Sequence, residues 1–212
     1  MKTTGNGKIL KRAGLVLIAA ALLLTGYNIY DDVRAGRSIF SVLSEFPEPE
    51  SRQAGDEDDP GVLAEETIPD YLLYPEMEMP TVTIDGNAYI GILEIPAAEK
   101  RLPVLSKYSE GGLKIAPCRY AGSAYTNDMV ICAHNYRSHF GGMSGVRPGD
   151  AVLFTDVSGN VFSYEIYEIE QVDPTDPEYM IYSDYDLTLF TCTLGGQLRN
   201  AYRCIRTESA PQ

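Results

Sequence analysis

The feature that most constrains this 212-residue chain is an uninterrupted apolar stretch close to its first residue. Residues 13–30 contain only two clearly polar side chains, Thr25 and Asn28, and the preceding residues 1–12 carry four bases. At about 1.5 Å per residue, a helix over this stretch is roughly 27 Å long, close to the thickness of the hydrocarbon core of a bilayer. Residues 13–30 are therefore predicted to form a transmembrane helix in the lipid bilayer.

The charges on the two sides of this stretch predict its orientation. Bases precede it, whereas Asp31 and Asp32 follow it, and positive charge is retained on the cytoplasmic side of a membrane. We therefore expect a single-pass protein of the cell membrane, with residues 1–12 in the cytoplasm and the chain after residue 30 outside. A cleaved signal peptide is the alternative, but Thr-Gly-Tyr at 25–27 fits a cleavage site poorly.

The charge of the chain is unevenly distributed. The net charge is −13, and −11 of it lies on residues 45–78, where twelve acids accompany a single base. No basic cluster follows residue 12, so the chain lacks the attraction to phosphate on which most nucleic-acid binding depends. We therefore expect no nucleic-acid partner.

Two segments are predicted between the apolar stretch and the C-terminal part of the chain. In residues 31–46, apolar side chains recur at roughly helical spacing, which predicts a juxtamembrane helix that ends before Pro47. Residues 47–79 are rich in acids, proline and glycine, a composition typical of a tether that buries too little apolar area to fold. A loosely packed pro-segment is the open alternative, because Tyr-Leu-Leu-Tyr at 71–74 could dock on a domain.

Residues 80–212 have the pattern of an all-β domain. Short β-branched and aromatic runs alternate with turn signals such as Asp-Gly-Asn at 85–87 and Ser-Gly-Asn at 158–160. The expected strands are residues 88–95, 101–105, 129–133, 151–155, 161–172, 187–192 and 201–207. With brief helical interruptions near Leu113 and Met143, this pattern predicts a closed or nearly closed barrel of seven to eight strands.

Two side chains at the ends of predicted strands are candidates for chemistry. Cys192 ends the strand 187–192, and His134 directly follows the strand 129–133. A strand holds a thiol at its mouth still while substrate can reach it. A packed core residue is the common alternative for a single cysteine or histidine, but two such residues at strand ends favour a nucleophile and its base.

Arg199 is the third candidate, because it lies seven residues after Cys192 and just before the last predicted strand. A guanidinium stays ionised at any working pH and presents several donors, so it can hold a carbonyl and then the oxyanion of a tetrahedral intermediate. Arg203 and Arg206 compete for this role. A surface salt bridge is the alternative for Arg199.

The other cysteines do not define a disulfide. Cys118, Cys132 and Cys204 allow three pairings with Cys192, and the sequence leaves both free thiols and pairs open. Cys132 is two residues from His134, so the two side chains are expected on one face of a strand, with Cys132 in the core.

No metal site or other cofactor is expected. The spacing of cysteines and histidines lacks the close pairs typical of structural zinc, since His134 and His139 are five residues apart and no CxxC is present. The acids within residues 173–186 could bind calcium, but they lack an ordered ligand spacing and favour a solvated loop.

The candidate residues resemble those of a known family. TLFTC at 188–192 resembles the TLxTC signature of the sortases, the membrane-anchored cysteine transpeptidases of Gram-positive bacteria, and MVICAHN at 129–135 is similar to the strand that delivers their histidine. His134 precedes Cys192 by 58 residues and Arg199 follows it by 7, which suits the family's order. Ala133 departs from the glycine that many relatives have there. The resemblance covers about residues 80–207 and implies a sortase-type barrel as the catalytic domain of residues 80–212.

The resemblance also implies a two-step acyl transfer. Cys192 would attack the threonine carbonyl of an LPxTG-like sorting motif near the C-terminus of a secreted protein and form a thioester, with His134 as acid and base and Arg199 stabilising the oxyanion. An amine of a cell-wall precursor or of a pilin would then take the acyl group. Thr191 could help to position the substrate, although a buried strand threonine is an equal interpretation.

Two other classes of protein are alternatives. A papain-like peptidase also uses cysteine and histidine, but there the cysteine precedes the histidine and stands next to tryptophan, which this chain lacks. A membrane-tethered, non-enzymatic β-barrel that binds a partner would need neither Cys192 nor Arg199.

Overall fold

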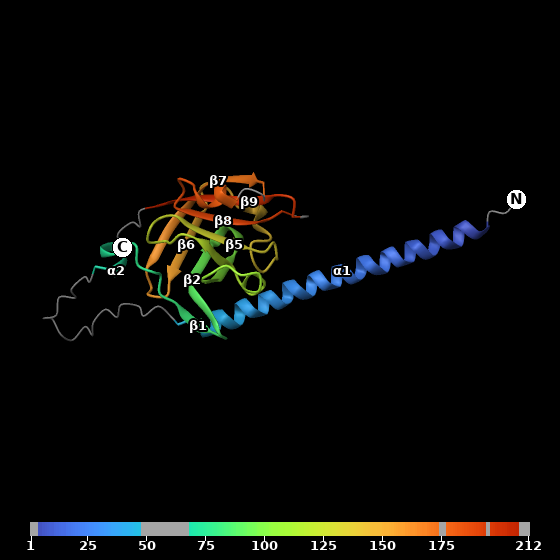
Figure 1. Cartoon of the computed structure of the whole chain (residues 1–212), viewed down its shortest axis with the longest axis horizontal. Coiled ribbons are helices and arrows are strands. Elements are labelled where there is room, and N and C mark those ends of the chain that lie inside the picture. Colours follow the sequence, from blue (N-terminus) through green and yellow to red (C-terminus); the bar gives the residue numbers. More distant parts are fainter. Residues whose placement is uncertain (1–3, 48–67, 174–176, 194–195, 208–212) are drawn as a thin grey trace.

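The computed structural model describes residues 4–47, 68–173, 177–193 and 196–207. A long N-terminal helix, α1 (Thr4–Glu45), leads to a β-barrel, and Figure 1 shows that the first part of this helix projects away from the barrel. Most of the expected tether, residues 48–67, lies outside the described residues.

The helix α1 is continuous through both segments that were predicted before residue 47. It is the one helix in the described ranges that is long and apolar enough to cross a membrane by length and composition. Apolar side chains in its first part, such as Leu15 and Leu23, are exposed, whereas Ala35, Ile39 and Val42 are buried against the barrel. The helix therefore has an exposed apolar part followed by a part that packs on the domain.

The described strands form a closed barrel. They are β1 (Val82–Ile84), β2 (Asn87–Ile95), β3 (Lys100–Leu105), β4 (Cys118–Ala121), β5 (Met129–Ala133), β6 (Ala151–Asp156), β7 (Val161–Val172), β8 (Leu187–Cys192) and β9 (Arg199–Arg206). Hydrogen bonding follows the order β2-β3-β4-β5-β8-β9-β7-β6, and β6 pairs with β2, so eight strands close the barrel while β1 pairs only with β2. The predicted all-β barrel of seven to eight strands is confirmed.

Short helical pieces interrupt the barrel. They are α2 (Asp70–Leu73), α3 (Pro177–Ile181) and the 3-10 turns Pro96–Ala98, Gly112–Lys114 and Met143–Gly145. The turns near Leu113 and Met143 were predicted. The strands β1 and β4 and the helices α2 and α3 were not, because three to five residues are too few to show a clear period.

The two faces of β5 and β8 have different surroundings. Ile131 and Leu189 point into the barrel and belong to its main core, together with Tyr202 of β9. Side chains alternate across a strand, so Cys132 and Phe190 lie on the outer face. There Cys132 is buried in a second apolar cluster, and Phe190 packs against this cluster while partly buried. The inner face therefore fixes the strands, and the outer face is left to form a site.

The segment before β1 lies against the barrel. The ring of Tyr71 stacks on Tyr125 with 4.8 Å between centroids and contacts Phe162 at 5.2 Å, and Met79 is 3% exposed. Leu72 and its two successors in the chain remain exposed. The sequence left open whether residues 71–74 dock on the domain. In the structure they do so through Tyr71.

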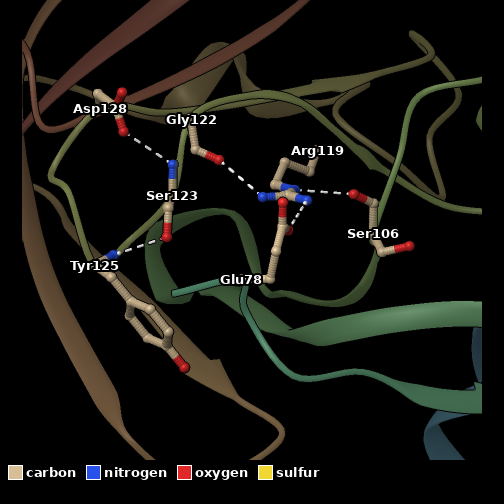
Figure 2. Close-up of polar contacts among 7 residues, drawn as sticks. All are labelled: Glu78, Ser106, Arg119, Gly122, Ser123, Tyr125 and Asp128. Carbon is tan, nitrogen blue, oxygen red and sulfur yellow. Dashed lines mark hydrogen bonds and ion pairs between the residues drawn. The ribbon is translucent and has the colours of Figure 1, made fainter. Parts of the chain in front are cut away.

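Arg119 of β4 ties this segment to the barrel. Its side chain donates hydrogen bonds to the carbonyl oxygens of Ser106 at 2.9 Å and Gly122 at 3.1 Å, as Figure 2 shows. The same guanidinium pairs with Glu78 at 3.4 Å. Because Glu78 is largely exposed, the two carbonyl contacts contribute most of what holds Arg119.

Candidate active site

His134 and Cys192 come to the same end of the barrel because β5 and β8 are parallel neighbours. The register pairs Ala133 with Thr191, the last residue but one of β8. His134 therefore follows β5 at the level where Cys192 ends β8. By alternation, Cys192 shares the outer face of its strand with Phe190.

Arg199 reaches Cys192 across the β8–β9 hairpin. The two residues are directly opposite each other in the antiparallel register, and Nη1 of Arg199 donates to Sγ of Cys192 over 2.6 Å. A charged donor this close can stabilise an oxygen that develops negative charge beside the sulfur. The three candidate residues thus meet at one rim, with Arg199 in direct contact with the thiol.

Cys192 borders two cavities. The first, which we call the Arg199 cavity, has a volume of about 150 Å³. It is lined by Tyr108, Leu113, Tyr120, Cys132, Ala133, Asp173, Met180, Phe190, Thr191, Cys192 and Arg199. Tyr120 meets Phe190 edge to face at 5.4 Å between centroids. An apolar, aromatic wall with one guanidinium at its end suits an extended peptide whose carbonyl is presented to the thiol.

His134 is half-buried and borders the second cavity, described below with the helix α1. Its Nε2 has no hydrogen-bond partner among the described residues. Burial lowers the pKa of His134 below its ordinary value, and the carboxylates of Glu110 and Asp31 only partly oppose this effect. The imidazole is therefore mainly neutral at pH 7 and can accept a proton.

His139 is a residue of this region that the sequence did not single out for catalysis. It is fully buried, its ring stacks 6.5 Å from that of His134, and neither ring nitrogen has a partner among the described residues. Burial lowers the pKa of His139 to about 4. The only signal in the sequence that His139 would be buried was the presence of Phe140 and Met143 close to it in the chain.

The competing arginines have other positions. Arg203 is 1% exposed and donates to Glu170 at 2.7 Å and to Thr188 at 3.0 Å. Arg206 donates to Asn127 at 2.7 Å, at the opposite end of β9 from Arg199. Both therefore fix the barrel rather than face the thiol.

Thr191 borders the Arg199 cavity, but its position differs from that of Cys192. The residue is 2% exposed, and its Oγ1 is buried without a partner among the described residues. By alternation with Cys192, its side chain points to the interior of the barrel.

The other thiols are free and buried. Cys118 and Cys132 are directly opposite each other on β4 and β5, and neither is in a disulfide. Burial raises the pKa of Cys204, and the contact with Cys118 together with burial raises that of Cys132. Of the four cysteines, Cys192 is the most exposed. Among the described residues, no group of three or more potential ligands could hold a metal ion.

Comparisons with known proteins agree with this geometry. The chain resembles sortase C from Streptococcus pneumoniae with a TM-score of 0.53 and 23% identity, over 67% of this chain and 87% of that one. It resembles sortase C1 from Streptococcus agalactiae with a TM-score of 0.52 and 22% identity, over 69% and 80% of the two chains. For sortase C1 of the pilus island 1 of GBS the TM-score is 0.51 at 21% identity, and the match spans 58% of this chain and 66% of that one. A comparison with curated protein sequences found no match.

These likenesses concern the fold. A family model described as the sortase domain matches residues 93–207, which is more than half of the chain and contains all three candidate residues. The chain therefore belongs to the sortase family of cysteine transpeptidases.

Proposed function

We propose that this protein cleaves an LPxTG-like sorting motif near the C-terminus of secreted proteins and transfers the upstream part to an amine. The observation that carries the proposal is the 2.6 Å contact between Arg199 and the sulfur of Cys192 at the end of the Arg199 cavity. A guanidinium in this position can bind the substrate oxygen that develops negative charge beside the sulfur.

In the first step, the thiolate of Cys192 attacks the threonine carbonyl of the motif. The carbonyl oxygen becomes an oxyanion, which Arg199 stabilises. His134 takes the proton of the Cys192 thiol, and the resulting imidazolium donates that proton to the leaving amine as the C–N bond breaks, which leaves a thioester on Cys192. The side chain of Thr191 is buried. Its contribution to this site is therefore to hold the end of β8, and with it Cys192, in place.

In the second step, an incoming amine attacks the thioester carbonyl and gives its proton to His134. The C–S bond breaks, an amide forms and Cys192 regains its proton. The amine comes from a cell-wall precursor or from a pilin. One of the similar structures is a pneumococcal sortase C described with pilin substrate specificity, which supports the second source.

The helix α1 would place this chemistry at the cell surface. Residues 13–30 would span the membrane once, with residues 1–12 in the cytoplasm and the barrel of residues 80–212 outside. The exposed apolar side chains before residue 31 support this arrangement, because exposed leucine and isoleucine side chains in such number favour lipid over water.

The test is to trap the thioester. The full-length protein in lipid nanodiscs is incubated with a mixture of sorting-motif peptides, and intact mass spectrometry measures the adduct on Cys192. We expect an adduct whose mass equals the part of one peptide that ends in threonine. Cys192→Ala should give no adduct, and His134→Ala should give no turnover. Peptide cleavage that persists in either variant would exclude this mechanism, whereas a wild-type protein that neither forms an adduct nor cleaves any peptide would favour a binding module.

A further inference from the structure

The second cavity at Cys192 has a wall that comes from the helix α1. It has a volume of about 440 Å³ and is lined by Asn28, Ile29, Asp32, His134, Asn135, Tyr136, Arg137 and Cys192. We call it the α1 cavity. Its lining includes the end of the predicted transmembrane segment 13–30, so the helix that anchors the protein also borders the reactive sulfur.

The two cavities divide the candidate residues between them. Arg199 lines only the Arg199 cavity, His134 lines only the α1 cavity, and Cys192 lines both. The sulfur therefore lies between a side that offers an oxyanion partner and a side that offers a proton acceptor.

The helix is fixed to the segment that carries His134, so this wall is part of the folded domain. Oδ1 of Asp32 accepts hydrogen bonds from the backbone amide of Ser138 at 2.9 Å and from its hydroxyl at 2.8 Å. Lys100 of β3 donates to the carbonyl oxygen of Arg137 in the same segment. Behind these contacts, Ala35 is fully buried.

The chemistry of the second step decides which cavity the amine uses. The amine must reach the carbonyl carbon bonded to the sulfur of Cys192, and its proton must pass to His134 as the new C–N bond forms. The oxyanion meanwhile points to Arg199 in the other cavity. The apolar, aromatic lining of the Arg199 cavity suits the acyl chain of the first substrate, which leaves the α1 cavity as the approach to the thioester from the side of His134.

We propose that the α1 cavity is the acceptor site for the amine of the second step. This inference rests on the proposed function and adds that the anchoring helix forms one wall of the second substrate's site. The Asp32 carboxylate on that wall attracts the ammonium form of such an amine before it loses its proton. Asp31, the preceding residue, does not line the cavity and pairs with Arg34 at 3.6 Å. Arg137, which is exposed, also lines the cavity.

The test uses the full-length protein in nanodiscs, a cleavable sorting-motif peptide, and two amines, triglycine and the much smaller hydroxylamine. Asn28→Trp narrows the cavity from an exposed helix position. We expect kcat/KM for triglycine to fall about tenfold or more, while kcat/KM for peptide cleavage changes by less than about twofold and hydroxylamine still reacts. Asn28→Ala, which widens the cavity, should keep triglycine transfer.

Val33→Trp is the matched control, because Val33 is exposed on the same helix and does not line the cavity. It should leave both steps unchanged. Triglycine transfer that is equal in Asn28→Trp and the wild type would overturn the inference, as would an equal loss of cleavage and transfer. A wild-type protein that cleaves no peptide before any amine is added would overturn the proposed function instead, and the inference with it.

Discussion

The two ends of the barrel differ in how their buried polar atoms are paired, although the hydroxyl of Tyr164, opposite Arg206, also has no partner among the described residues. Where β5 and β8 finish, Nε2 of His134 and Oγ1 of Thr191 are buried without a partner among the described residues. At the other end, Asp156 is 2% exposed, and its carboxylate accepts from the Tyr125 hydroxyl at 2.7 Å. It also accepts from the backbone and the side chain of Asn160, each at 2.9 Å.

This difference separates reactivity from stability within one fold. A buried polar group without a partner costs about 1–3 kcal/mol, whereas a fully satisfied buried network makes the surrounding structure rigid. At the site end, Nε2 of His134 is thus left for a substrate, and at the opposite end the Asp156 network holds neighbouring segments together. Substitutions at the site end should change rates, and substitutions at the opposite end should change the free energy of unfolding.

The largest effect is expected for Cys192→Ala. Removal of the nucleophile should lower kcat/KM for peptide cleavage by about 10³-fold or more, since no other group can form the thioester. The midpoint of urea unfolding should stay near that of the wild type, because Cys192 is only partly buried. Cleavage is measured by chromatography of the released peptide, and a large loss of stability would contradict the proposed division between the two ends.

Arg199→Ala should lower kcat/KM about a hundredfold, equivalent to about 3 kcal/mol, because one donor to the developing oxyanion is lost. Arg206→Ala is the matched control. It removes a guanidinium from the opposite end of the same strand, where Arg206 contacts Asn127. Comparable losses of cleavage rate in the two variants would show that the position beside the thiol is not what matters.

The third prediction concerns acid stability at the site end. His139 has a pKa of about 4 in the folded protein and about 6.5 when unfolded. The unfolded chain therefore binds one more proton between these values, and the free energy of unfolding should fall as the pH drops from 7 to 4, by about 3 kcal/mol in total. His139→Phe should remove much of this dependence.

The measurement is urea unfolding at several pH values, followed by tyrosine fluorescence because the chain has no tryptophan. Above pH 7, His139 is neutral in both the folded and the unfolded protein. The plots of the free energy of unfolding against pH should therefore be parallel there for the wild type and the variant. An unchanged slope below pH 6.5 in His139→Phe would assign the acid sensitivity to other groups.

The sequence predicted the strands whose period is long enough to read. The expected bounds of β5, β7 and β8 match the structure, because each combines apolar or alternating residues with clear turn signals. β4 (Cys118–Ala121) was missed. Its four residues are too few to show a period, and its pairing with β3 and β5 depends on other parts of the chain.

The sequence named three candidate residues, whose roles stay predictions, but it did not predict their surroundings. Strand ends and spacing identified His134, Cys192 and Arg199. Their meeting depends on the parallel pairing of β5 and β8, which a sequence period does not report. The docking of α1 beside His134 was also not predicted, because an apolar helix face shows that a partner exists without showing which one. The hydrogen bond from Ser138 to Asp32 joins residues 106 positions apart.

The smallest effect is expected for Tyr125→Phe, which tests the end of the barrel opposite Cys192. The substitution removes only the hydroxyl that donates to Asp156 and leaves the ring that stacks on Tyr71. Because Asn160 still donates to the same carboxylate oxygen, the free energy of unfolding should fall by only about 1 kcal/mol. Peptide cleavage should stay at the wild-type rate, since this network lies at the end of the barrel away from Cys192. A loss of activity without a loss of stability would mean that the two ends are coupled through the strands, and the division between a reactive end and a stabilising end would then be wrong.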